Sequence, residues 1–134
     1  MDVQFETEGD SMIAIADKDA IYQVIYNLCH NAIKFSREGG VFRVSIKRVA
    51  GKKLCFSVYD DGQTISEEDA AHIFDRFYKT DKSRGLDKNG VGLGLYICKT
   101  IIDAHGESIA VATLDGGCEF SFTVKEGEAA KPKI

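Results

Sequence analysis

The stretch Asn27-Leu28-Cys29-His30-Asn31-Ala32-Ile33-Lys34-Phe35 decides the fold of this 134-residue chain. Asn27, Asn31 and Lys34 fall at i, i+4 and i+7, so on a helix they form one narrow polar stripe beside an apolar face. Asparagine is a mediocre helix former, but its amide oxygen can ligate a hard cation, and lysine can meet phosphate. The stripe is therefore either a magnesium and phosphate site or a solvated polar face.

The helix that carries this stripe is expected to start after Asp17, which can cap it, and to end at about Phe35 or Ser36, before Gly39-Gly40. Its apolar residues recur at helical spacing and predict a core face. They are Ile21, Val24, Ile25, Leu28, Ala32 and Phe35.

Strands and further helices are predicted around it from alternation and from turn residues. Short strands are expected at 3–5 and 12–16, a hairpin at 42–46 and 54–58, a helix capped by Ser66, a loop at 78–92, a helix from about Leu93 to His105 before Gly106, and two final strands at 108–113 and 118–124. This order predicts an α+β fold, a two-layer α/β sandwich whose mixed, mostly antiparallel sheet carries helices on one face.

The length fits one domain, which we place at residues 1–125, followed by a charged, flexible tail at 126–134. A net charge of −4 argues against a nucleic-acid partner. No apolar run approaches the ~20 residues of a membrane span, and the start lacks a signal-peptide pattern. The four cysteines form no CxxC pair, so they predict buried, reduced thiols, in keeping with a reducing cytoplasm, rather than a zinc cage.

Two further segments could bind a nucleotide. Asp60-Asp61-Gly62 ends the second hairpin strand, where a carboxylate could accept a hydrogen bond from an exocyclic amine such as that of adenine; an ordinary Asp-Gly turn is the alternative. Gly90-Val91-Gly92-Leu93-Gly94-Leu95 leads straight into a helix, which favours a phosphate site. The dinucleotide-binding and Walker patterns are both absent, so a flexible hinge is the alternative there. The cations before it, Lys82 and Arg84 among them, are typical of a lid, and a merely solvated loop is the alternative.

Four segments in this order carry a resemblance to a known family. They are Asn27 to Phe35 (N box), Asp60-Asp61-Gly62-Gln63-Thr64-Ile65 (first glycine box), Phe74-Asp75-Arg76-Phe77-Tyr78 (F box) and Gly90 to Leu95 (second glycine box). Over nearly its whole length the chain resembles the catalytic, ATP-binding domain of sensor histidine kinases, within the gyrase, Hsp90, histidine kinase and MutL superfamily.

The resemblance implies a Bergerat-type ATP-binding fold with ATP and Mg²⁺ as its cofactors. Asn31 would be the magnesium ligand with Asn27 supporting it, and Lys34 would approach the phosphates. Asp60 would bind the adenine amino group. The remaining expected contacts are Phe35, Gly62 and Ile65 near the base, and Lys82, Arg84, Gly90, Gly92, Leu93 and Gly94 around the phosphates. Phe74 and Phe77 would anchor the lid and face a partner domain.

The reaction implied is that of a protein-histidine kinase. Related hydrolases and serine kinases resemble each other in carrying a glutamate at the position of Asn27, where it activates a poor nucleophile, water or a hydroxyl group. A histidine acceptor has a free lone pair near pH 7 and needs less activation. For transfer to histidine, positioning and charge neutralisation therefore suffice. His30 could serve as a base but is better interpreted as an ordinary helix residue. None of the three histidines, His30, His72 and His105, is followed by an acidic residue, so the acceptor is expected on a separate dimerisation domain.

The partners implied are that dimerisation and phosphoacceptor domain of the same protein and a downstream response regulator. This domain would be cytoplasmic, either in a cytoplasmic protein or as the cytoplasmic part of a membrane sensor kinase. Two departures favour the alternative of a degenerate nucleotide-binding or docking module without kinase turnover. Thr64 replaces the second glycine of the first glycine box, and Asp61 adds a negative charge near the expected base site.

Overall fold

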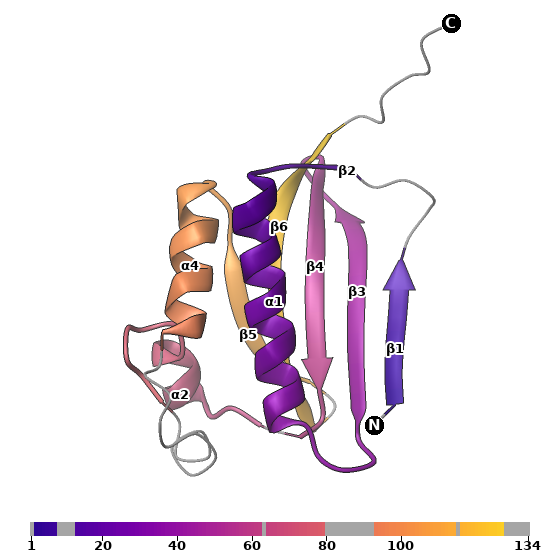
Figure 1. The fold of residues 1–134 in the computed structure, drawn as a ribbon, viewed down its shortest axis with the longest axis vertical. Coiled ribbons are helices and arrows are strands. Elements are labelled where there is room, and N and C mark those ends of the chain that lie inside the picture. Colours follow the sequence, from indigo (N-terminus) through magenta and orange to yellow (C-terminus); the bar gives the residue numbers. More distant parts are fainter. Residues whose placement is uncertain (1, 8–12, 63, 80–92, 115, 128–134) are drawn as a thin grey trace, which may run out of the picture.

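Two long helices lie side by side on one face of a single β-sheet (Figure 1). The computed structural model describes residues 2–7, 13–62, 64–79, 93–114 and 116–127. The helices are α1 (Lys18–Phe35), the short α2 (Glu67–His72) and α4 (Gly94–Ala104). This is the two-layer α+β sandwich that the sequence predicts. Within the described residues, no helix is both long enough and apolar enough to cross a membrane.

The sheet is mixed and mostly antiparallel, as expected. Its order is β1-β3-β4-β6-β2, and β5 also pairs with β6. Only β1 runs parallel to its neighbour, β3. β5 and β2 follow each other along the edge of β6 that β4 leaves open. The strands are β1 (Asp2–Thr7), β2 (Ile13–Ile15), β3 (Val41–Val49), β4 (Lys53–Asp60), β5 (Ile109–Leu114) and β6 (Gly117–Gly127).

The helix ends confirm the capping residues predicted from the sequence. Asp17 Oδ1 accepts a hydrogen bond from the Ala20 N–H at 3.0 Å, which satisfies a backbone donor of the first turn of α1. Ser66 Oγ does the same for the Asp69 N–H at 3.1 Å at the start of α2. After α4, Gly106 adopts a φ of 71°, a left-handed conformation that suits glycine.

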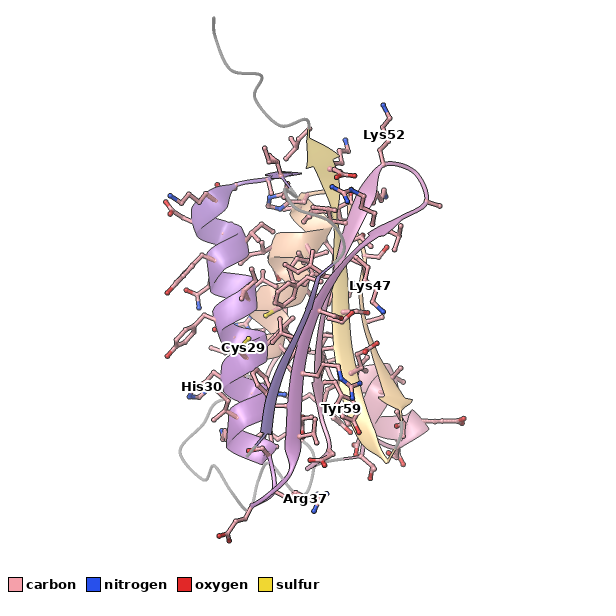
Figure 2. The ribbon with its side chains drawn as sticks, turned by 90° about the vertical axis from the view of Figure 1, so that its right-hand side faces the viewer. Cys29, His30, Arg37, Lys47, Lys52 and Tyr59 are labelled. Atoms are coloured by element: carbon pink, nitrogen blue, oxygen red, sulfur yellow. The ribbon has the colours of Figure 1, made fainter. Side chains whose placement is uncertain are left out.

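The core lies between the helices and the sheet. α1 buries Val24, Leu28, Ala32 and Phe35, and α4 buries Cys98 and Ile102. They pack on the apolar side chains of β3, β4 and β6. Figure 2 shows this division from the side, with His30 pointing away from the sheet. The predicted apolar face of α1 is therefore the face that it buries.

The last strand extends past the predicted domain boundary at residue 125. β6 continues through Glu126 to Gly127. The Glu126 N–H donates to the Lys52 carbonyl at 2.8 Å, and the Glu126 carboxylate pairs with Arg48 at 2.7 Å. The charged residue that suggested a tail is thus held by the β3–β4 hairpin. The remaining residues of the expected tail, 128–134, lie outside the described residues.

Close backbone contacts join three elements at the end of β4. A Cβ added to Gly62 would overlap the backbone of the last turn of α1, at the Phe35 carbonyl oxygen. A Cβ added to Gly117 would overlap the Asp60 carbonyl oxygen. Side chains at these two positions would separate α1 and β6 from the end of β4.

Gly62→Ala is therefore expected to destabilise the fold by about 1–3 kcal/mol, the usual cost of overpacking. Urea unfolding followed by circular dichroism measures the loss. Gly94→Ala is the matched control, because a Cβ there meets nothing within 4 Å. Equal stability of the two variants would show that the close contact at Gly62 is not needed.

A buried carboxylate links the turn after α4 to the sheet. Glu107, whose side chain is 2 % exposed, accepts hydrogen bonds from Lys53 Nζ at 3.0 Å and from Thr123 Oγ1 at 2.8 Å. The Lys53 hydrogen bond lowers the pKa of Glu107, and with the Thr123 hydrogen bond it outweighs the burial that raises it, so the pKa lies below its ordinary value of 4.5.

A carboxylate with a lowered pKa stabilises the fold above its unfolded pKa and loses this effect as the pH falls through its folded pKa. Glu107→Gln should therefore cost roughly 0.5–1 kcal/mol near neutral pH, and the difference should vanish as the pH falls well below 4.5. Thermal unfolding of both proteins across this range checks it, with the exposed Glu38→Gln as control. A difference that grows in acid would contradict the assignment.

Candidate functional site

Asn27 connects the polar stripe of α1 to the start of α4. Its Nδ2 donates to the Gly94 carbonyl at 3.3 Å, and its Oδ1 accepts from Gln23 Nε2 at 2.8 Å. Both ends of this carboxamide are therefore engaged within the protein. The first asparagine of the stripe holds the two helices together where α4 begins.

Asn31 lies one turn further along the same stripe. Its side chain is half-buried, and within the described residues its carboxamide makes no hydrogen bond. Among the described residues there is also no cluster of three or more histidine, cysteine or acidic side chains that could cage a metal ion. Mg²⁺ usually takes most of its ligands from phosphate and water, so one neutral amide oxygen such as that of Asn31 is compatible with such a site.

Lys34 and Phe35 end α1 as a pair. Lys34 Nζ lies 5.4 Å from the centre of the Phe35 ring, and that ring is buried. The ammonium group and the ring therefore occupy adjacent places at the end of the stripe. Of the two, Phe35 also lies against Gly62, through its backbone carbonyl.

Asp60 is a buried carboxylate at the end of β4, only 1 % exposed. Its Oδ1 accepts from the Gly62 N–H at 2.8 Å, and its Oδ2 faces the Cys118 thiol at 3.7 Å. The first contact is an Asx turn, in which the side chain accepts from the amide two residues on. The carboxylate is thus fixed in orientation by the chain that follows it.

Asp61, the next residue, has a different role from the one expected. Its Oδ1 accepts from the Val41 N–H at 2.9 Å, and its Oδ2 pairs with Arg37 at 3.0 Å. Burial raises the pKa of Asp61, but these hydrogen bonds and the Arg37 charge together lower it. Its negative charge is matched by Arg37 and closes the loop between α1 and β3; Figure 2 shows Arg37 at that loop.

Thr64 and Ile65 follow with ordinary backbone geometry. Among the described non-glycine residues only Lys52 and Phe77 have positive φ, so Thr64 is not forced into the conformation that a glycine would favour. Ile65 is buried, and its carbonyl accepts from Thr113 Oγ1 at 3.0 Å. The threonine is therefore accommodated without the strain expected from its branched side chain.

The start of α4 has no side-chain cap. Leu93 stands at the N-cap position without a side-chain hydrogen bond, and no acidic residue occurs in the first turn. The first amides of a helix need outside acceptors and carry partial positive charge. Leu93 and Gly94 stand at this helix start, whereas Lys82, Arg84, Gly90 and Gly92 lie outside the described residues.

The two F-box phenylalanines separate into different environments. Phe74 packs edge-on against Phe120, with ring centres 6.0 Å apart. Phe77 is 57 % exposed, with the Arg76 guanidinium 4.8 Å from its ring centre. Beside them is an open groove of about 310 Å³, which none of the predicted nucleotide residues lines; its walls are Phe74, Asp75, Arg76, Tyr96, Lys99, Thr100 and Asp103.

The four cysteines are free thiols, as predicted, but only two of them are buried. Burial raises the pKa of Cys98 to about 12, with a small opposing effect from Asn27, and burial also raises the pKa of Cys29. These two thiols stay protonated near neutral pH. Cys118 has a polar partner in Asp60, which its apolar sequence context does not reveal.

Sequence reasoning missed two residues that contact the predicted site. Gln23 lies four residues before Asn27 and extends its stripe, a spacing that could have indicated the contact. Gly117 lets β6 approach Asp60; because the two are far apart in the sequence, no local signal marks this contact.

Comparisons with known proteins agree with this fold. Residues 16–128 match the family described as histidine kinase-, DNA gyrase B-, and HSP90-like ATPase. The sensor protein KdpD of Clostridium acetobutylicum is 40 % identical over 91 % of this chain, and the sensor histidine kinase WalK of Bacillus subtilis is 41 % identical over 81 % of it. The matched segments make up only 14 % of KdpD and 18 % of WalK.

Solved structures lead to the same family. The nucleotide-free catalytic domain of the histidine kinase ThkA superimposes with a TM-score of 0.80 at 35 % identity, covering 92 % of this chain and 78 % of that one. ThkA in complex with the response regulator TrrA gives 0.78 at 32 % identity, covering 94 % and 34 %. Full-length ShkA in complex with AMPPNP gives 0.80 at 28 % identity, covering 98 % and 27 %.

The family match and these relatives each cover most of the chain, and the superposition extends to the whole sandwich. The chain therefore belongs to the histidine kinase-, DNA gyrase B-, and HSP90-like ATPase family, as the ATP-binding catalytic domain of a sensor histidine kinase.

Proposed function

We propose that this chain binds ATP with Mg²⁺ and presents the γ-phosphate to a histidine on a separate dimerisation domain of its parent protein. The observation that carries the proposal is the start of α4. Its amides lack a side-chain cap and an acidic neighbour, and the polar stripe of α1 reaches it through Asn27 and Gly94.

The phosphates belong at this junction because helix N-termini favour anions. Leu93 and Gly94 offer backbone N–H groups there, and the first turn of α4 has no acidic residue that would repel a phosphate. Lys34 supplies positive charge from the end of the stripe. Lys82, Arg84, Gly90 and Gly92 are proposed to complete the phosphate contacts.

Asn31 is the proposed magnesium ligand. A neutral amide oxygen beside a phosphate site suits a hard cation that keeps its waters, and Asn31 makes no hydrogen bond within the described part of the chain. When bound, the metal supplies neutralisation of phosphate charge. Asn27 supports Asn31 by holding α4 in place rather than by offering a free ligand atom.

Asp60 is proposed to accept the adenine amino group. Its carboxylate is buried and held by Gly62 and Cys118, so its orientation is set before a base arrives. Hydrogen bonds to a charged acceptor are stronger than neutral ones. Phe35, Gly62 and Ile65 surround this end of the site through their contacts with the last turn of α1 and with β5.

Phosphoryl transfer to histidine fits the residues on α1 better than hydrolysis does. Asn27 stands where a general base would be needed. His30 is exposed and stacks on Tyr26, with ring centres 5.9 Å apart, which supports its interpretation as an ordinary helix residue. We propose that the dimerisation domain meets the exposed Phe77, and that a response regulator receives the phosphoryl group, as the ThkA–TrrA complex suggests by analogy.

The alternative is a degenerate docking module. Thr64 and Asp61 favoured it, but Thr64 adopts no positive φ and Asp61 is paired with Arg37. Titration with a non-hydrolysable ATP analogue separates the two functions, because a docking module would show no saturable binding at millimolar nucleotide.

Asp60→Asn should weaken binding of the ATP analogue about tenfold, because a charge-assisted hydrogen bond is worth roughly 1.5–3 kcal/mol. Isothermal titration calorimetry measures the change. Asp61→Asn removes the same charge one residue away and should change affinity little. Inorganic triphosphate, which has no base, should bind both variants equally. Equal losses in the two variants would mean that charge, not the adenine contact, matters.

Asn31→Ala should abolish the gain in nucleotide affinity that Mg²⁺ gives the wild type, while metal-free binding stays the same, because only the metal ligand is removed. Paired titrations with Mg²⁺ and with EDTA measure this. Ile33→Ala, on an exposed side chain of the same helix, is the control. If Asn31→Ala still gains affinity from Mg²⁺, the metal ligand lies elsewhere.

A further inference from the structure

The Gly94 carbonyl determines the direction of a short hydrogen-bond relay. A carbonyl oxygen only accepts hydrogen bonds, so the Asn27 atom 3.3 Å from it is Nδ2. Asn27 Oδ1 must then face Gln23, whose Nε2 donates to it at 2.8 Å. The relay therefore runs in one direction, from Gln23 through Asn27 to the first residue of α4.

A donor at position 23 adds to the preference for this orientation, beside the Gly94 carbonyl and the Cys98 side chain that also contact Asn27. The oxygen and the NH₂ group of a carboxamide can exchange places with little change in shape. The last torsion of the side chain has only a broad rotamer preference, which does not select one of the two orientations. A donor on Oδ1 favours the orientation in which Nδ2 meets Gly94. Gln23 is one helical turn before Asn27, a spacing at which glutamine and asparagine side chains pair.

Other contacts hold the two helices together along the rest of their length. Cys98 Sγ lies 3.8 Å from the Val24 carbonyl, and the Asp17 N–H donates to His105 Nε2 at 3.1 Å. The apolar core lies beneath them. Loss of the Gln23 donor therefore leaves the helix pair folded and changes the carboxamide at the start of α4.

We propose that Gln23 is a positioning residue that orients the Asn27 carboxamide and so places the first turn of α4 against the polar stripe of α1. The effect of Gln23 on nucleotide affinity rests on the function proposed above. Its effect on the orientation of the Asn27 carboxamide does not, and can be measured in the absence of nucleotide.

Three substitutions separate a donor role from a charge role. Gln23→Met keeps length and helix propensity without donor or charge. Gln23→Glu is nearly isosteric but only accepts, so it draws Nδ2 of Asn27 away from Gly94. Gln23→Lys keeps a hydrogen-bond donor and adds a positive charge, opposite in sign to the charge that Gln23→Glu adds. Tyr22→Met is the matched control, because Tyr22 is 70 % exposed and one residue turns it about 100° around the helix.

The first measurement is NMR of the Asn27 side-chain amide in the nucleotide-free chain. We expect one bonded, slowly exchanging Hδ2 proton in the wild type, Tyr22→Met and Gln23→Lys, and its loss in Gln23→Met and Gln23→Glu. Unchanged Asn27 resonances in Gln23→Met would overturn the proposal.

The second measurement is a double-mutant cycle on binding of the magnesium-bound ATP analogue. Gln23→Met and Gln23→Glu should each weaken it roughly three- to tenfold, and Gln23→Met should have no further effect in an Asn27→Ala background. Unchanged affinity in Gln23→Met, additive effects with Asn27→Ala, or opposite effects of Glu and Lys around a neutral Met would each overturn the positioning role. A wild type that binds no nucleotide would refute the proposed function instead, and the NMR result would still decide the relay.

Discussion

The rotation of α1 about its own axis is the constraint on which the rest of the structure depends. Val24, Leu28, Ala32 and Phe35 are buried against the sheet, and each fully buried apolar side chain of this size contributes about 1.5–3 kcal/mol, alanine less. A rotation that brought Asn27 and Asn31 to the positions of Leu28 and Ala32 would bury asparagine and expose leucine. Burial of the apolar face therefore determines where the polar stripe points, without any ligand.

The second helix is held by contacts along the whole length of α1. α4 contacts α1 through three polar atoms of α1 or its N-cap, namely the Asn27 amide, the Val24 carbonyl and the Asp17 N–H. Going from the start of α4 to its end, the contacted position moves from the middle of α1 back to its start. The uncapped first turn of α4 is thus brought to the middle of α1, where the N box begins. The proposed phosphate site lies at this junction.

Two neighbouring acids show how tertiary contacts assign different roles to one residue type. Asp60 is buried and faces Gly62 and Cys118, whereas Asp61 is held by Arg37 and the Val41 amide. Asp60 is the last residue of β4, and successive side chains of an extended chain point to opposite sides. The two adjacent acids therefore face different surroundings, and Asp61 closes the loop between α1 and β3 with its charge paired to Arg37.

The sequence by itself determined both long helices, the β3–β4 hairpin, the last two strands and the identity of the family. Each of these depends on spacing within one segment, such as the apolar repeat of α1 or the cap at Asp17. Asn27, Asn31, Lys34 and Asp60 could be selected in the same way. Only the tertiary structure decided that Asn27 contacts both Gln23 and Gly94, that Gly62 and Gly117 admit close backbone contact, that Asp61 pairs with Arg37, and that Glu126 belongs to the sheet. The reason is physical: most of these roles come from contacts between segments far apart in the chain, and local periodicity carries no information about which distant backbone will approach.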